Sequence, residues 1–347
     1  MGRTRGSIGR RLVGAVVLMT IVTAGANLAG AAAPGSVWTP HASARVTELM
    51  SVAYGNGTFV AITGDGTDRV MTSPDGATWT EHPTPQDDDW KEVTFGNGLF
   101  VAIALGGVNQ VMTSPDGVTW TPRLASEASL WWSVTYGNGL FVAVSLSGPH
   151  GVMTSPDGIT WTAHDTVENG FWVSVRYGNG LFVAVSETDQ VMSSSDGVTW
   201  TQHTAPEANF WESLAYGNGL FVAVSIAGSN RVMTSPDGVT WTARAATEQN
   251  QWRSITFGYG LFVAVSEDGT NRVMTSPDGV TWTPYPAAEP NRWYSVTSGN
   301  GLFLAVSLDG TNQVMTSSAF ATPSPSSTVP STTPAAPPVV TPPQFTG

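Results

Sequence analysis

The 347-residue sequence contains no cysteine, which excludes disulfide bridges and thiolate metal sites. Charged residues make up only 12% of the chain, and its five histidines are scattered, so neither a metal site nor a bound cofactor is expected. Basic residues are few: 14 Lys and Arg stand against 26 Asp and Glu. This acidic balance argues against nucleic acid or an anionic membrane as the main partner.

The N-terminus has the order of a secretory signal peptide. Four arginines (Arg3, Arg5, Arg10 and Arg11) precede the apolar segment Leu12–Ala24, and the small residues Ala29-Gly30-Ala31 follow. An uncleaved membrane anchor is the alternative, although the apolar segment is short for that role. Removal of residues 1–31 would leave 10 basic and 26 acidic side chains, a net charge of −16. We therefore expect a secreted protein, extracellular or associated with the cell envelope, with no membrane insertion after cleavage.

Two phrases recur along the rest of the chain. The first is Tyr54-Gly55-Asn56-Gly57, whose copies follow at intervals of 41, 41, 41, 39, 41 and 41 residues. The second is Ser73-Pro74-Asp75-Gly76-Ala77-Thr78-Trp79, whose later copies end at Trp120, Trp161, Trp200, Trp241 and Trp282. A Val-Met pair lies between the two phrases in every copy, first at Val70-Met71. Repeats of this length are typical of β-propellers, in which each repeat is one blade.

Each repeat reads as four short strands. In the second copy we predict strands over residues 90–95, 99–104, 110–114 and 118–121, with Asn97-Gly98 as a tight hairpin turn. The second of these strands is an almost unbroken apolar run, as expected for a sheet covered on both faces. The sequence thus predicts an all-β fold: a seven-bladed propeller over residues 34–320.

The copy number also predicts how the ring closes. Seven copies of the first three strands are present, but only six Asp-Gly-x-Thr-Trp phrases follow them. The missing outer strand has a counterpart at the other end of the chain, in Ser36-Val37-Trp38-Thr39, where Trp38 stands 41 residues before Trp79. We predict that this N-terminal strand completes the last blade, which removes the open sheet edges without a disulfide. Residues 321–347, rich in Pro, Ser and Thr, are expected to form a disordered linker or stalk.

The Ser-Pro-Asp-Gly-x-Thr-Trp phrase resembles the Asp-box of the bacterial neuraminidase repeat (BNR-like) superfamily, which includes sialidases and many secreted bacterial proteins that are not sialidases. The resemblance covers residues 36–318. It departs in one respect, because Asp75 and Gly76 are adjacent where the sialidase form has a spacer. The resemblance implies the propeller fold; it does not by itself imply sialidase activity.

The further signature of sialidases is missing from the sequence. No Arg-Ile-Pro occurs, and the tyrosines before the Gly-Asn-Gly turns (Tyr54, Tyr136, Tyr177 and Tyr216) share one repeated position typical of packing residues. An active site occurs once in a chain, so its residues should not recur in every repeat. The best remaining candidates for catalysis are therefore Tyr294 and Arg292, a tyrosine and an arginine without counterparts in the other repeats. We assign no catalytic residue, and a sialidase-like glycoside hydrolase remains an alternative.

The aspartates of the second phrase form one repeated set. An Asp before Gly in a tight turn accepts hydrogen bonds from its own backbone, which predicts a structural role; a calcium ring is the alternative. The set consists of Asp75, Asp116, Asp157, Asp196, Asp237 and Asp278.

A second repeated set follows each outer strand and reads loosely His/Arg-x-x-x-Glu-x-Asn-x-Trp. It should lie on the face opposite the Asn-Gly turns, beside loops that end in Arg231 and Arg272. An aromatic ring beside a carboxylate, an amide and a guanidinium suits sugar binding, whereas the structural alternative is that the Trp packs between blades and the His or Arg pairs with the Glu. The candidate ligand residues are Glu127, Trp131, Glu168, Trp172, His203, Glu207, Asn209, Trp211, Arg231, Glu248, Asn250, Trp252, Arg272, Glu289, Asn291 and Trp293.

Taken together, the sequence favours a monomeric, secreted, non-catalytic recognition propeller for carbohydrate or a partner on the cell surface. A purely structural spacer on a Pro/Thr stalk is the rival, and fold alone cannot choose between them.

Overall fold

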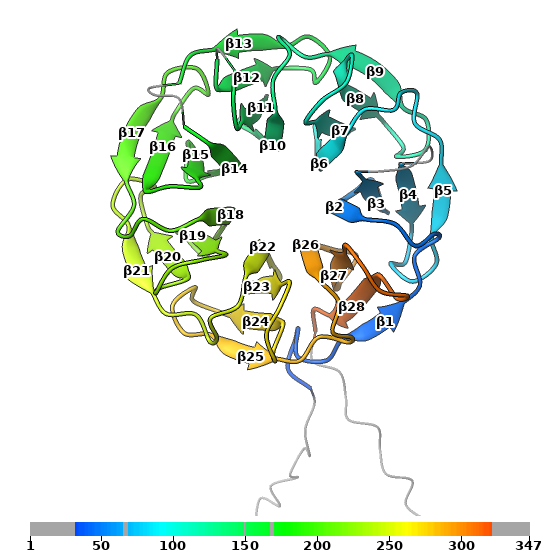
Figure 1. Cartoon of the computed structure of the whole chain (residues 1–347), viewed down its shortest axis with the longest axis vertical. Helices are drawn as coiled ribbons and strands as arrows, with labels where there is room; N and C mark the ends of the chain where they lie inside the picture. Colours follow the sequence, from blue (N-terminus) through cyan, green and yellow to red (C-terminus); the bar gives the residue numbers. More distant parts are fainter. Residues whose placement is uncertain (1–31, 65–68, 149, 167–169, 321–347) are drawn as a thin grey trace, which may run out of the picture.

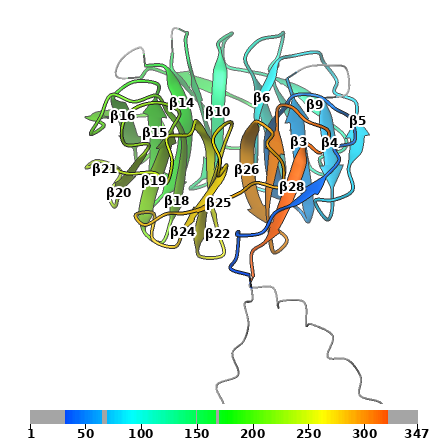
Figure 2. The same cartoon turned by 60° about the horizontal axis from the view of Figure 1, so that its bottom comes forward.

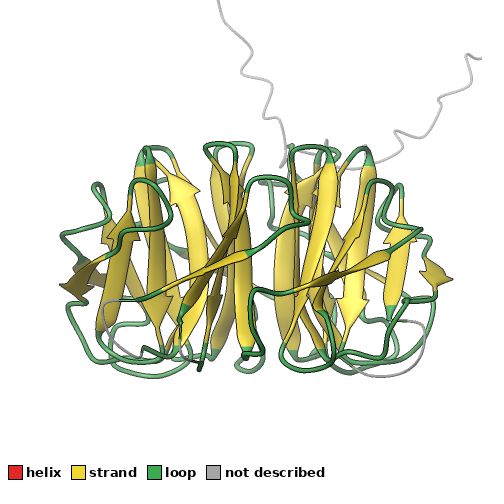
Figure 3. Cartoon of the chain, turned by 90° about the horizontal axis from the view of Figure 1, so that it is seen from above, coloured by secondary structure: helices red, strands yellow, loops and turns green. Residues whose placement is uncertain are grey.

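The computed structural model describes residues 32–64, 69–148, 150–166 and 170–320. Over these residues the chain forms 28 strands in seven four-stranded antiparallel sheets, arranged as the blades of a closed propeller (Figure 1). Figure 3 shows strands and loops only, and no helix able to cross a membrane occurs among the described residues. The predicted seven-bladed propeller is therefore confirmed. The signal peptide and the Pro-rich tail lie outside the described residues.

The four strands of a blade follow one another from the centre of the ring to its rim. The innermost strands, which line the central channel, are β2 (Leu49–Gly55), β6 (Trp90–Gly96), β10 (Trp131–Gly137), β14 (Trp172–Gly178), β18 (Trp211–Gly217), β22 (Trp252–Gly258) and β26 (Trp293–Gly299). The second strands are β3 (Thr58–Thr63), β7 (Leu99–Ala104), β11 (Leu140–Ser145), β15 (Leu181–Ser186), β19 (Leu220–Ser225), β23 (Leu261–Ser266) and β27 (Leu302–Ser307).

The two outer positions complete each sheet. The third strands are β4 (Val70–Ser73), β8 (Gln110–Ser114), β12 (Val152–Ser155), β16 (Gln190–Ser194), β20 (Val232–Ser235), β24 (Val273–Ser276) and β28 (Val314–Ser318). The outermost strands are β5 (Thr80–His82), β9 (Thr121–Leu124), β13 (Thr162–His164), β17 (Thr201–Thr204), β21 (Thr242–Arg244), β25 (Thr283–Tyr285) and, from the N-terminus, β1 (Thr39–His41).

The N-terminal clasp is confirmed. β1 pairs antiparallel with β28, and Thr39 lies opposite Thr316, so the first and the last described strands share the last blade (Figure 2). Trp38 is buried in the same apolar cluster as Trp293, Phe303 and Met315. The paired strand is β1 at 39–41, whereas the repeat placed it at 36–39.

The outer strand of the second blade also begins later than predicted. In the second blade β9 covers 121–124, not 118–121. Asp116 explains the shift, because its carboxylate accepts the backbone N–H groups of Val118 and Thr119, both at 2.9 Å. These residues therefore belong to the turn and cannot pair with β8. The indole of Trp120 then donates to the carbonyl of Gly117 at 2.9 Å, which closes the turn.

Close packing between blades depends on a glycine at the end of each innermost strand. A Cβ on Gly137 would lie 2.1 Å from the ring of Tyr177 in the next blade, so only glycine fits there. The tyrosines before the turns are thus packing residues, as predicted. The last blade departs from this arrangement: Ser298 replaces the aromatic residue, and Tyr259 from the preceding turn packs edge-on against Phe303, with ring centroids 6.0 Å apart.

A ring of hydrogen bonds ties the innermost strands together around the channel. Ser213 accepts the backbone N–H of Ile255 in the next blade at 3.2 Å. The same contact occurs at all seven junctions with lengths of 2.7–3.3 Å, and only Glu92 replaces the serine. The ring closes between Ser295 and Val52. Each bond satisfies one backbone N–H on the otherwise unpaired inner edge of a sheet, in a chain that has no disulfide to hold its blades together.

Candidate functional site

The aspartates of the repeated turn have the geometry of a structural cap. Asp157, for example, accepts the backbone N–H groups of Ile159 and Thr160 and the hydroxyl of Ser155, all within 2.9 Å. Such bonds favour the charged form and lower the pKa of each of the six carboxyls, that of Asp196 to about 2. Among the described residues no group of three or more His, Asp or Glu could hold a metal ion.

The repeated loop residues bond mainly to one another and to the backbone. Glu207 accepts the side-chain amide of Asn230 at 2.5 Å, and this bond is the main cause that lowers the pKa of Glu207. Asn209 donates to the carbonyl of Asn230 at 2.6 Å, and Arg231 donates to the carbonyl of Asn250 at 2.7 Å, which joins this blade to the next. Equivalent bonds link Glu248 to Asn271, Glu289 to Asn312, Asn250 to Asn271, Asn291 to Asn312, and Arg272 to Asn291.

The tryptophans of this set are buried between blades. The side chains of Trp131, Trp211, Trp252 and Trp293 are 0% exposed and that of Trp172 is 1% exposed, so in this conformation no ring face is free to stack on a sugar. Glu127 binds His150 at 2.7 Å, and Glu168 lies outside the described residues. The face opposite the Asn-Gly turns (the loop face) therefore has the geometry expected for a structural role, in which the Trp side chains pack between blades.

The histidines of the set do not have the partner expected for a structural role. That role predicted pairing between the His or Arg and the Glu four residues later. The structure instead places His203 Nε2 2.8 Å from the hydroxyl of Ser193 on the neighbouring strand β16, and His164 bonds Thr154 in the same way. Burial lowers the pKa of His203. The reason is that antiparallel pairing of β16 and β17 places Ser193 and His203 on the same face of the sheet, whereas Glu207 lies beyond the end of β17, in the loop.

The non-repeated residues gather elsewhere, at the centre of the ring. Each innermost strand places the residue after its first position into the channel, and this residue differs in every blade. These residues are Met50, Lys91, Trp132, Val173, Glu212, Arg253 and Tyr294. Because the innermost strands start at the loop face, this set lies at that end of the channel. The described ends of the chain lie on the opposite face, which carries the Asn-Gly turns (the turn face). There the backbone N–H of Ala319 donates to the carbonyl of Gly301 in the last Gly-Asn-Gly turn.

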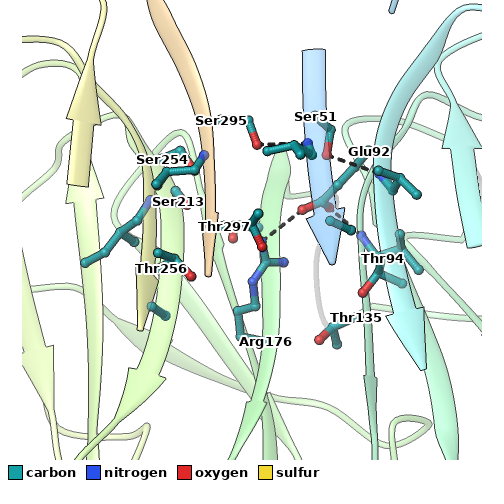
Figure 4. A pocket seen from close by; sticks show the side chains of 18 of the residues that line it. Ser51, Glu92, Thr94, Thr135, Arg176, Ser213, Ser254, Thr256, Ser295 and Thr297 are labelled. Atoms are coloured by element: carbon teal, nitrogen blue, oxygen red, sulfur yellow. Dashed lines mark hydrogen bonds and ion pairs between the residues drawn. The ribbon is translucent and has the colours of Figure 1, made fainter. Parts of the chain in front are cut away.

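The channel holds a cavity of about 340 Å³, near the lower end of the roughly 300–1,000 Å³ of small-molecule sites. Polar side chains line much of its wall, as the serines and threonines in Figure 4 show. Glu92 and Arg176, which replace repeated small residues, form an ion pair of 2.9 Å along this wall (Figure 4). The cavity is thus hydroxyl-rich, with charged groups at defined points.

Lys91, the single lysine of the chain, is the centre of an aromatic cluster at the loop-face end. Its ammonium lies 3.8 Å from the ring centroid of Trp132 and 4.7 Å from that of Tyr294, and it donates to the Tyr294 hydroxyl at 2.5 Å. Although Lys91 is only 5% exposed, aromatic faces and a phenol hold it rather than a carboxylate. Such cation–π contacts gain strength when the cation is desolvated.

A charged network adjoins this cluster. Arg253 lies 3.2 Å from Glu212 and 3.0 Å from Glu267, and Arg292 lies 3.3 Å from Glu267. Burial raises the pKa of the Glu212 carboxyl. Of the two residues that the sequence marked as singular, Tyr294 thus lines the channel, whereas Arg292 does not and is linked to the lining residue Arg253 only through Glu267. The other channel residues were missed, although a position that varies in every copy of a regular repeat was a usable signal.

Comparisons with known proteins place the chain among β-propellers. Residues 33–177 match the DUF6242 beta propeller domain. A search of curated proteins gives no match. The match covers the first part of the ring and says nothing of a sialidase or of BNR repeats.

Several solved structures share this fold. Virginiamycin B lyase from Staphylococcus aureus superposes with a TM-score of 0.72 at 11% identity over 81% of this chain and 98% of its own. YCF48 from Cyanidioschyzon merolae gives 0.61 at 16% identity over 82% and 98%, and a second YCF48 structure is bound to D1 peptide. The computationally designed Ika8 protein gives 0.58 at 11% identity over 81% and 100%. At these identities the likeness shows the fold alone.

Proposed function

We propose that this protein is a secreted, non-catalytic recognition propeller that binds carbohydrate in its central channel. The observation that supports this most is the cluster of Lys91, Trp132 and Tyr294 inside a polar cavity of about 340 Å³. Sugars are bound by aromatic faces that cover their C–H surfaces and by polar groups that take their hydroxyls. The channel has both, whereas the loop face has its tryptophans buried.

The rest of the chain is consistent with such a role outside the cell. The signal-like residues 1–31 support export, and the described chain ends lie on the turn face, so the loop face would point away from any attachment through either end. The Asp-box-like turns support the proposed kinship with BNR-like secreted propellers. We propose no catalytic group, because Glu92 and Glu212, the carboxylates that line the channel, each pair with an arginine.

The proposal is tested with the mature propeller and a glycan array, followed by titration calorimetry on the sugars that bind. Trp132→Leu should abolish binding, and Tyr294→Phe should weaken it, while both variants keep the wild-type circular dichroism spectrum. Tyr285→Phe, on the outer strand β25, is the matched control and should bind as wild type. Wild-type protein that binds no glycan would favour the spacer alternative, and cleavage of a sialoside would favour the hydrolase.

A further inference from the structure

One carboxylate oxygen in the channel lacks a hydrogen-bond donor among the described residues. The side chain of Glu212 is 5% exposed, and its Oε1 atom lies 3.2 Å from Arg253. Its Oε2 atom is buried with no partner. A buried polar atom without a partner is unfavourable, and its occurrence in a native structure calls for an explanation. Because Glu212 lines the cavity, a small rotation of its side chain would bring this atom to a ligand that donates a hydrogen bond.

The charges around the cavity are nearly balanced. Arg176 pairs with Glu92, and Arg253 contacts both Glu212 and Glu267. Lys91 is the remaining cation of the lining, and its charge acts on the Glu212 carboxyl. An anionic ligand drawn to Lys91 would therefore meet the carboxylate of Glu212 as well. This arrangement disfavours a carboxylated sugar and suits a neutral one, since a hydroxyl can both donate and accept a hydrogen bond.

We propose that the channel selects an uncharged sugar by two neighbouring hydroxyls. One hydroxyl donates to Glu212 Oε2, the other accepts from Lys91 Nζ, and the sugar ring lies against Trp132 and Tyr294. This inference rests on the proposed carbohydrate recognition and names its ligand class. Arg253, 3.2 Å from Glu212, favours the charged form of that carboxyl, so both hydrogen bonds involve an ionised partner and are stronger than bonds between neutral groups.

The experiment compares three forms of each sugar on the wild-type protein. Calorimetry is carried out with methyl glycosides of the common hexoses, with their uronic acid counterparts, and with analogues that lack one hydroxyl. We expect at least one neutral hexoside to bind, its uronic acid to bind about tenfold more weakly, and loss of either of two adjacent hydroxyls to weaken binding by about tenfold or more. These measurements require no variant and so do not depend on the folding of one.

Two isosteric substitutions then assign the contact. Glu212→Gln should weaken binding of the neutral sugar by about tenfold, because the amide loses the charge that strengthens the bond. Glu248→Gln makes the same chemical change in the loop network outside the channel and should leave binding unchanged. Melting temperatures of both variants report their folding.

The outcomes separate this inference from the function on which it rests. Tighter binding of uronic acids than of neutral hexosides would overturn the inference and leave carbohydrate recognition intact. Unchanged affinity of a folded Glu212→Gln variant would likewise overturn it. Absence of binding to any sugar would overturn both.

Discussion

Ser213 and Ile255, 42 residues apart in the sequence, join two blades at the channel wall through a hydrogen bond of 3.2 Å from the Ile255 backbone N–H to the Ser213 hydroxyl. The donor belongs to the free inner edge of β22, where no further strand can pair with it. Seven such bonds close a circle that has no disulfide, so a side chain of the repeat supplies the lateral connection that the sheets themselves cannot.

Replacement of Ser213 by alanine tests this connection. The variant leaves the buried N–H of Ile255 without an acceptor, and we expect a loss of about 1–3 kcal/mol in the free energy of unfolding. Urea denaturation followed by circular dichroism gives the value. Ser126→Ala is the control, because the buried Ser126 hydroxyl has no hydrogen bond among the described residues. Equal stability of the two variants would mean that the serine ring does not hold the blades together.

Deletion of residues 34–41 tests the clasp. The deletion removes β1 from β28 and takes away Trp38, whose burial in the apolar cluster of the last blade should by itself be worth about 3–5 kcal/mol. The melting temperature should fall markedly, and backbone amides of β28 should exchange with solvent sooner. Deletion of residues 321–347, which lie outside the described propeller, serves as the control and should leave the melting temperature unchanged. A clasp deletion that melts as wild type does would refute the closure mechanism.

The aspartate turns predict how stability depends on pH. Their pKa values are lowered in the folded protein, so the unfolded chain binds more protons at acidic pH. This contribution to stability is fully present above the ordinary Asp pKa of about 4 and is lost as the pH falls towards the value of about 2 given for Asp196. Asparagine keeps an acceptor oxygen but does not titrate in this range. A chain with all six turn aspartates changed to asparagine should therefore show a flatter melting temperature between pH 4 and 2; an unaltered slope would contradict this origin.

Glu207→Gln with Glu248→Gln tests the loop network. Each carboxylate receives the amide of an asparagine at 2.5 Å and a backbone N–H at 3.2 Å. Loss of the charge weakens these bonds, so the double variant should melt at a lower temperature but bind the channel ligand as tightly as wild type. Calorimetry and thermal melting on one preparation decide the matter. Weaker binding at unchanged stability would restore these loop residues as ligand contacts.

Much of the propeller could be derived from the repeat. The Asn-Gly turn at Asn97, the 41-residue interval and the missing seventh Trp phrase depend on local turn chemistry and on counting, and these led to the correct blades and to the clasp of Trp38. The outer strand of the second blade was misplaced by three residues because Asp116 takes backbone donors that the sequence pattern had assigned to the sheet.

The candidate site shows the limit of the same approach. A repeat directs attention to what recurs, and the recurring Glu207 and Trp211 prove to be bonded and packed within the fold. Lys91, Glu212 and Tyr294 occupy one register but share no residue type, and more than 80 residues separate each from the next. Only closure of the ring brings their strands around one axis. The sequence by itself determined the blade, its turns and the number of copies, because those depend on contacts within a repeat; the tertiary structure alone decided which side chains face each other across the channel, because that contact exists only when seven blades meet.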